Sequence, residues 1–111
     1  MAEPVSPDIT LTTCASITDI PRDDWQRLAG RSNPFLRYEF FQALEDSGCT
    51  RTETGWTPCH LVFRMQGKIC GLAPAYLKNH SRGEYVFDWS WAEAYQRYQL
   101  SYYPKLLIAI P

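Results

Sequence analysis

The pattern of apolar and polar positions divides the chain into strand-like and helix-like segments. Residues 9–17 are rich in Ile, Leu and Thr and alternate loosely, which predicts a strand. A first helix is predicted to begin near Pro21, which suits a first helical turn, and to end at Gly30. A second helix is predicted over residues 37–47, where apolar side chains recur on one face.

A β-hairpin is predicted in the middle of the chain. Its strands are residues 59–65 and 68–77, joined by a two-residue Gln-Gly turn. This register places Phe63 opposite Cys70 and puts Leu72 on the same face as Phe63. Both faces are largely apolar, so helices are expected to cover the sheet on both sides.

Two further strands and a break are predicted from shorter signals. Pro74 cannot donate to a strand ladder, which indicates an edge position or a bulge. Residues 84–87 are predicted to form a short strand, and residues 105–110 a buried one.

A third helix is predicted between these two strands. Asp88 is placed to cap its N-terminus, and Glu93 and Arg97 have the i,i+4 spacing of an ion pair. One face is an aromatic stripe that is expected either to pack into the core or to line a binding cleft: Trp91, Tyr95 and Tyr98.

The predicted order of elements is strand, two helices, hairpin, short strand, helix and strand. This order indicates an α/β domain with a mixed sheet and helices on both of its faces. A chain of 111 residues has room for one domain, assigned to residues 9–111 after a disordered tail at residues 1–8. The apolar run at residues 106–110 stops at Pro111, which predicts a partial domain that is truncated at its C-terminus.

Composition and charge exclude several classes of protein. The net charge of −1 leaves no basic surplus to hold a phosphate backbone, so no DNA partner is expected. No apolar stretch approaches the ~20 residues of a membrane-spanning helix. The N-terminus lacks the basic start and apolar run of a signal peptide, which predicts a cytoplasmic location. The four cysteines and two histidines are not spaced as zinc ligands, so reduced thiols and no metal site are predicted.

Aromatic side chains are concentrated toward the C-terminal end. Nine of the sixteen lie between Tyr76 and Lys105, interleaved with charged groups. Aromatic walls lower the local dielectric and strengthen nearby polar groups, which favours a substrate cleft. We predict three candidate catalytic groups for proton transfer: His80, Glu84 and Asp88. We predict that substrate is bound by further side chains: Lys78, Tyr85, Trp89, Trp91, Tyr95, Tyr102 and Tyr103.

Several stretches of sequence resemble one bacterial protein family. They are NPFL at 33–36, ALEDSGC at 43–49, ETGW at 53–56, YLKNHSRGEYVFDW at 76–89 and YYPKLL at 102–107. The family is that of GNAT-like acyltransferases, similar to the Fem-type enzymes that add amino acids to peptidoglycan precursors. The resemblance covers about residues 9–111.

The resemblance implies a fold and an activity. The fold would be the N-terminal half of a GNAT-like (acyl-CoA N-acyltransferase) domain, because family members are longer and contain two such units. The activity would be transfer of an acyl or aminoacyl group to an amine, with a small molecule or a peptidoglycan-type peptide as the acceptor. The donor of the full-length protein would be acyl-CoA or an aminoacyl-tRNA. No Gly-x-Gly turn opens a helix in this chain, so no cofactor is assigned to it and the chain alone is expected to be inactive.

A second interpretation is a non-catalytic recognition domain. In that case the aromatic segment binds a glycan, a peptide or a protein partner. Half of a GNAT-type sheet would also leave strand edges exposed, which predicts self-association.

Overall fold

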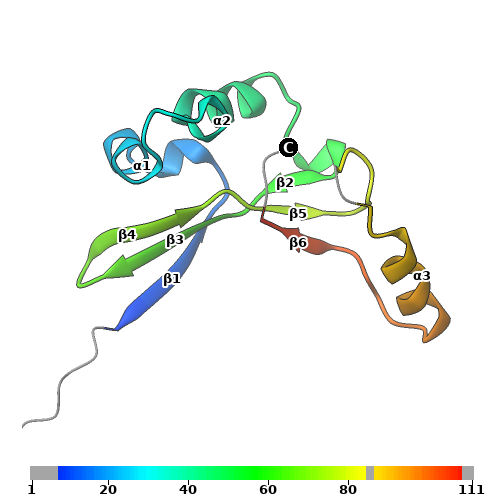
Figure 1. Ribbon diagram of the computed structural model, residues 1–111. Coiled ribbons are helices and arrows are strands. Elements are labelled where there is room, and N and C mark those ends of the chain that lie inside the picture. Colours follow the sequence, from blue (N-terminus) through cyan, green and yellow to red (C-terminus); the bar gives the residue numbers. More distant parts are fainter. Residues whose placement is uncertain (1–7, 85–86, 109–111) are drawn as a thin grey trace, which may run out of the picture.

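The computed structural model describes residues 8–84 and 87–108, which form two three-stranded antiparallel sheets and three α-helices (Figure 1). The first sheet has the order β1 (Ile9–Cys14), β3 (His60–Met65), β4 (Lys68–Ala73). The second has the order β2 (Trp56–Pro58), β5 (Tyr76–Lys78), β6 (Lys105–Leu107). The helices are α1 (Arg22–Ala29), α2 (Tyr38–Asp46) and α3 (Trp89–Arg97), with 3-10 turns at Ile17–Asp19, Pro34–Leu36 and Thr52–Thr54.

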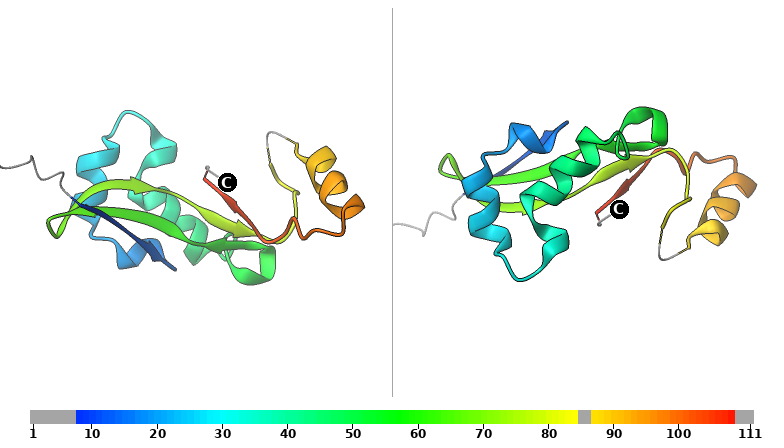
Figure 2. Two further views of the ribbon diagram at one scale, coloured as in Figure 1. Left: turned by 90° about the horizontal axis from the view of Figure 1, so that it is seen from below. Right: turned by 90° about the horizontal axis from the view of Figure 1, so that it is seen from above.

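The predicted hairpin is present and joins the two sheets. Strand β2 continues into β3 and strand β4 continues into β5, so one long hairpin runs through both sheets (Figure 2). The Cys59 N–H donates to the Ala75 carbonyl at 2.9 Å and keeps the two arms together at the junction. Pro74 lies just after β4 and interrupts the strand predicted over residues 68–77, and the bulge of the hairpin lies elsewhere.

The register of the hairpin differs from the prediction by one residue. Both turn residues have positive φ, 53° at Gln66 and 78° at Gly67, as a tight two-residue turn requires. A bulge between Phe63 and Arg64 then pairs Phe63 with Gly71, not with Cys70. Because one extra residue inverts the alternation, Leu72 faces the same side as Val62, where the sequence placed it with Phe63.

The two N-terminal helices form where local sequence predicted them. Gly30 ends α1 with a φ of 71°. Trp25 is buried on the inner side of α1, and its indole N–H donates to the Leu36 carbonyl at 2.7 Å. Phe41 is buried on the inner side of α2 and meets the Trp25 ring edge-to-face. The core lies between these helices and Val62 of the first sheet.

The sheet arrangement corrects two predictions. Both α1 and α2 lie on one face of the first sheet, and no helix of the described residues covers the other face (Figures 1 and 2). That other face carries Ile9 and Leu11, which are 61% and 55% exposed. All strand pairs among residues 8–84 and 87–108 are antiparallel, so the sheet is not mixed. The apolar surface of one hairpin face is thus left open and not buried under a helix.

Several element boundaries also differ from the prediction. The first strand ends at Cys14, because Ser16 caps a 3-10 turn through its side-chain oxygen. The last strand is half-exposed, with Leu106 and Ile108 48% and 58% exposed, so it is not the buried strand predicted. The rest of that prediction, residues 109–110, lies outside the described residues, as do residues 85–86 of the predicted short strand and residues 1–7 of the predicted tail.

Candidate functional site

Two lysines face each other where the second sheet ends. Strands β5 and β6 pair so that Lys78 lies directly opposite Lys105. The Lys78 side chain is fully buried, and its ammonium lies 3.8 Å from the centroid of the Trp56 ring. Like charges opposite each other destabilise a strand pair, so this pairing needs a bridging anion.

Glu84 supplies that anion. Its Oε2 accepts a hydrogen bond from Lys78 at 2.7 Å, and its Oε1 accepts one from Lys105 at 2.6 Å. The side chains of Glu84 and Lys105 are only 6% and 12% exposed. Removing one member of such a buried pair costs about 3–5 kcal/mol, because a charge is then left without its partner.

Asp88 extends the cluster to a second carboxylate. Its Oδ2 accepts hydrogen bonds from Lys105 and, at 2.6 Å, from the Tyr102 hydroxyl. Burial alone would raise the pKa of Asp88, but the hydrogen bonds from Lys105 and Tyr102 outweigh it and hold that pKa well below its ordinary value. The hydrogen bond to Asp88 is the main reason why the pKa of Tyr102 rises to about 12. Asp88 is therefore a carboxylate, and Tyr102 a neutral phenol, at neutral pH.

Tyr103 is held by the same cluster. Its hydroxyl lies 2.5 Å from the Ser81 Oγ, and Ser81 in turn accepts a hydrogen bond from Lys105 at 3.1 Å. Ser81 is fully buried. We call Lys78, Ser81, Glu84, Asp88 and Lys105 the buried ion cluster.

His80 lies apart from the cluster and is bonded through both ring nitrogens. Its Nδ1 accepts from the Arg82 N–H at 3.1 Å, so its Nε2 carries the proton that is donated to the Thr54 carbonyl at 2.9 Å. The ring packs over Gly55, where an added Cβ would lie 2.4 Å from Nε2. In this arrangement His80 fastens the loop after β5 to the 3-10 turn at Thr52–Thr54.

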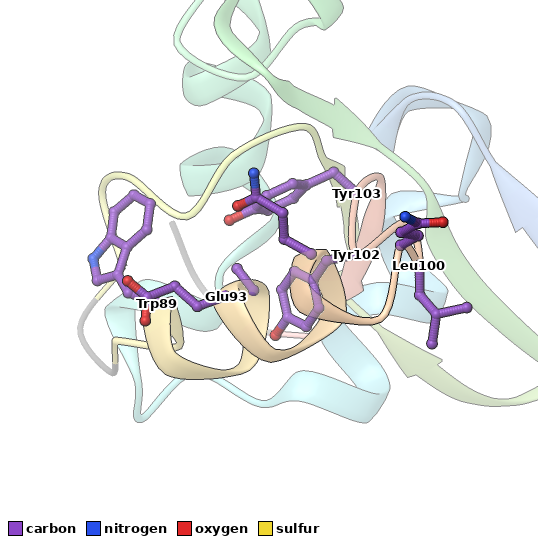
Figure 3. A pocket seen from close by; sticks show the side chains of 8 residues that line it. Trp89, Glu93, Leu100, Tyr102 and Tyr103 are labelled. Atoms are coloured by element: carbon purple, nitrogen blue, oxygen red, sulfur yellow. The ribbon is translucent and has the colours of Figure 1, made fainter.

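A pocket of about 440 Å³ opens beside the cluster, between α3 and the segment that follows it (Figure 3). Its lining residues are Trp89, Ala92, Glu93, Gln96, Gln99, Leu100, Tyr102 and Tyr103. In Figure 3, Trp89 and Glu93 lie at one end and Leu100 at the other, with Tyr102 and Tyr103 between them. Glu93 is the one charged residue in this lining.

The structure sorts the residues predicted from sequence into three groups. Glu84, Asp88 and Lys78 join the buried ion cluster. Trp89, Tyr102 and Tyr103 line the pocket. Trp91, Tyr95 and Tyr98 do not pack into the core, because they are 66%, 40% and 78% exposed. Tyr95 contacts the edge of the Tyr102 ring at 5.0 Å between centroids, and Tyr85 lies outside the described residues.

Two helix predictions for this region are corrected. Asp88 precedes α3, but its side chain caps no backbone N–H and is turned instead to Lys105 and Tyr102. Glu93 and Arg97 form no ion pair with each other, since the salt bridges found within residues 8–84 and 87–108 do not include either side chain. The second difference leaves Glu93 without an ion-pair partner among the described residues.

Sequence reasoning missed Ser81 and Lys105 of the cluster. It also missed five residues of the pocket lining: Ala92, Glu93, Gln96, Gln99 and Leu100. The closeness of Lys105 to Lys78 follows from strand pairing across 27 positions, which no local pattern encodes. Glu93 was assigned to an ion pair because its spacing to Arg97 is the only signal visible in the sequence.

Other kinds of site receive no support from the described residues. The four cysteines are free thiols. Within residues 8–84 and 87–108, no group of three or more His, Cys, Asp or Glu side chains is placed to hold a metal ion. No helix in the described part of the chain has the length and hydropathy needed to cross a membrane.

Comparison with known proteins places the chain in a family. The FemAB-like family model, described as peptidoglycan biosynthesis/recognition, matches residues 16–111, which include the buried ion cluster and the pocket. No match was found among curated proteins or among solved structures. The chain therefore belongs to the FemAB-like family, whose function is related to peptidoglycan.

Proposed function

We propose that this chain binds the acceptor of a Fem-type N-acyl transfer, a peptidoglycan-type peptide that bears a free amine. The observation that carries the proposal is the pocket between α3 and Tyr103, where aromatic walls and amide side chains lie together. Such a lining suits a peptide, because rings cover its apolar parts and the amides of Gln96 and Gln99 pair with its peptide groups. The family match covers this region and supports the same acceptor class.

The reaction that we propose for the protein is aminolysis. The acceptor nitrogen bonds to the carbonyl carbon of the donor, and the C–S bond of acyl-CoA or the C–O ester bond of an aminoacyl-tRNA breaks. The nitrogen loses a proton, and the thiolate or ribose oxygen that leaves takes one up. The order of β1, two helices and an antiparallel hairpin supports a GNAT-like fold for this unit.

Binding without transfer is the second candidate function. The observation in its favour is that the three predicted proton acceptors are engaged within the protein. His80 uses both ring nitrogens, Glu84 bridges two lysines, and Asp88 is bonded to Lys105. Mass spectrometry of a muropeptide incubated with the protein and each donor distinguishes the two functions, because only transfer adds the acyl mass.

The test of acceptor binding is a calorimetric titration with a soluble muropeptide, a disaccharide carrying its stem peptide. Trp89 lines the pocket, whereas Trp91 lies on the same helix outside the pocket lining. We expect Trp89→Ala to weaken binding about tenfold and Trp91→Ala to change it less than about twofold. Absence of binding by the wild-type chain, or a larger loss in Trp91→Ala, would refute the proposal.

A further inference from the structure

Strand β1 has one edge that is open to a partner strand. The first sheet has the order β1-β3-β4, so among the described residues β1 pairs with β3 alone (Figure 1). The sequence of β1, ITLTTC, contains no charged residue and no proline, and its pairing with β3 has no bulge. An edge strand of this kind presents a row of backbone N–H and C=O groups that a further strand can pair with.

The other sheet edges of residues 8–84 and 87–108 carry features that oppose such pairing. Strand β4, at the opposite edge of the first sheet, contains the bulge, and Arg27 donates a hydrogen bond to its Ile69 carbonyl at 2.9 Å. Pro74 follows β4 directly. Strands β2 and β6, at the edges of the second sheet, are only three residues long. Natural sheets block edge-to-edge pairing by these same devices, and the six-residue strand β1 has none of them.

The side chains of β1 alternate between two different surfaces. Ile9 and Leu11 lie on the open face of the first sheet, where they are 61% and 55% exposed. Thr10 and Thr12 lie on the face that carries the helices, where the Thr12 hydroxyl accepts a hydrogen bond from Arg64 at 2.7 Å. A strand that pairs with β1 should therefore bring apolar side chains to one face, small polar side chains to the other, and no charge.

The sequence of β1 meets these requirements itself when it runs antiparallel to a second copy. A two-fold axis at Leu11, perpendicular to the sheet, places this side chain opposite Leu11 of the second copy. Thr10 then lies opposite Thr12 of the second copy. Ile9 lies opposite Thr13 of the second copy on the open face. Apolar pairs and Thr–Thr pairs both stabilise antiparallel strands, and no like charges meet.

We infer that β1 is an interface through which two copies of this chain pair, antiparallel and about a two-fold axis at Leu11. The two first sheets then form one continuous sheet of six strands, with Ile9 and Leu11 of both copies side by side on one face. Six residues extend over about 20 Å, which buries less than the roughly 800 Å² per partner of a standard stable interface. The dimer is therefore reversible, with a Kd on the order of 10–100 µM. This interface lies on the first sheet and does not depend on acceptor binding beside α3.

Charges placed at the two-fold axis test this interface. Because residue 11 lies opposite itself, Leu11→Lys and Leu11→Glu each bring two like charges together. In sedimentation equilibrium at about 10–500 µM chain, each variant should dimerise at least about tenfold more weakly than the wild type. An equimolar mixture of the two variants should dimerise within about threefold of the wild type, because the facing charges then attract. Thr13→Lys is the matched control, since residue 13 lies about 14 Å from its counterpart, and it should change the Kd less than about threefold.

A disulfide measures the register directly. Directly opposed residues of antiparallel strands have Cα atoms about 4.5–5.5 Å apart, and a disulfide needs about 7 Å or less. With oxidised glutathione present, peptide mass spectrometry should detect a bond between the two introduced thiols of Leu11→Cys. Thr13→Cys, on the same strand and face, should give no such bond. Circular dichroism checks that each variant keeps the wild-type fold, and the disulfide alone decides where a charged variant does not fold.

The possible outcomes distinguish this interface from a general tendency to aggregate. A wild-type chain that stays monomeric up to about 500 µM would overturn the inference, and so would a dimer that Leu11→Lys leaves unchanged. Failure of the mixed variants to restore dimerisation, or equal cross-linking of Leu11→Cys and Thr13→Cys, would also overturn it. Loss of dimerisation in each charged variant, recovery in the mixture and cross-linking at residue 11 alone would support it.

Discussion

The buried His60 side chain makes the stability of the core depend on pH. The side chain is fully buried, and its Nδ1 accepts a hydrogen bond from the Ala75 N–H at 3.3 Å. The rings of Trp25, Phe41 and Tyr76 lie edge-on around it at 5.4–6.4 Å between centroids. Its Nε2 has no partner among the described residues. Burial among these rings lowers the pKa of His60 from 6.5 to about 4.

The lowered pKa of His60 sets the direction and the size of the change in the free energy of unfolding with pH. Below pH 6.5 the unfolded chain binds a proton at His60 while the folded chain does not, so stability is full above pH 6.5 and falls as the pH is lowered toward 4. One pKa unit corresponds to about 1.4 kcal/mol, so the whole shift corresponds to about 3 kcal/mol. Between pH 7 and pH 5 the same relation predicts a loss of about 2 kcal/mol.

The assay is urea unfolding at pH 7 and pH 5 for the wild type and for His60→Asn. Asparagine keeps an acceptor for the Ala75 N–H but does not titrate. The loss in the free energy of unfolding that the substitution causes at this site, apart from the effect of His60 titration, should therefore be the same at both pH values. We expect the wild type to lose about 2 kcal/mol more than the variant between pH 7 and pH 5. Equal losses would show that His60 has an ordinary pKa in the folded chain and would refute its burial as a neutral ring.

Three further predictions concern the site and the sheet. Lys105→Met should lower the free energy of unfolding by about 3 kcal/mol in a chemical denaturation experiment, because two buried carboxylates lose a cation. Gly55→Ala should be strongly destabilising, since its Cβ would collide with the His80 ring, and adding His80→Ala should recover part of the loss in thermal unfolding. The exposed edge strand β1 should cause self-association visible by light scattering, and Leu11→Lys should reduce it.

Two of these predictions have a matched control variant. Arg97→Met removes an exposed cation from α3 and should change stability by less than about 0.5 kcal/mol. Gly67→Ala measures the cost of a side chain at a φ of 78° with open space around it, against which the collision at Gly55 is judged. A protein that stays monomeric at all concentrations would contradict the prediction that the edge strand β1 causes self-association. A Gly55→Ala loss no larger than that of Gly67→Ala would argue against contact with His80.

Elements governed by neighbouring residues were predictable. The helix that ends at Gly30 and the hairpin turn at Gln66-Gly67 follow from conformations that glycine adopts readily, whatever the rest of the chain does. The face of α2 that buries Phe41 follows from helical spacing. The family likeness was also carried by short motifs and is confirmed by the match over residues 16–111.

The register of the hairpin was not predictable in the same way. A bulge changes which residues share a face, and the nearby Gly71 and Pro74 do not fix the position of the extra residue. Whether the aromatic stripe of α3 is buried could not be predicted for a related reason. Helical spacing shows that Trp91 and Tyr95 share a face, but it does not show whether anything packs on that face.

The sequence by itself determined the local elements, the charge balance and the family of this protein, because each depends on residue type and short spacing. Only the tertiary structure decided the chemistry of the site. Antiparallel pairing of β5 with β6 brings Lys105 opposite Lys78, and this makes Glu84 and Asp88 partners in a buried cluster instead of free acids. The same pairing places the Tyr102 and Tyr103 rings beside α3 and leaves Glu93 as the one charge in the pocket. Long-range strand pairing thus makes Glu84 and Asp88 part of the ion pairs that stabilise the fold.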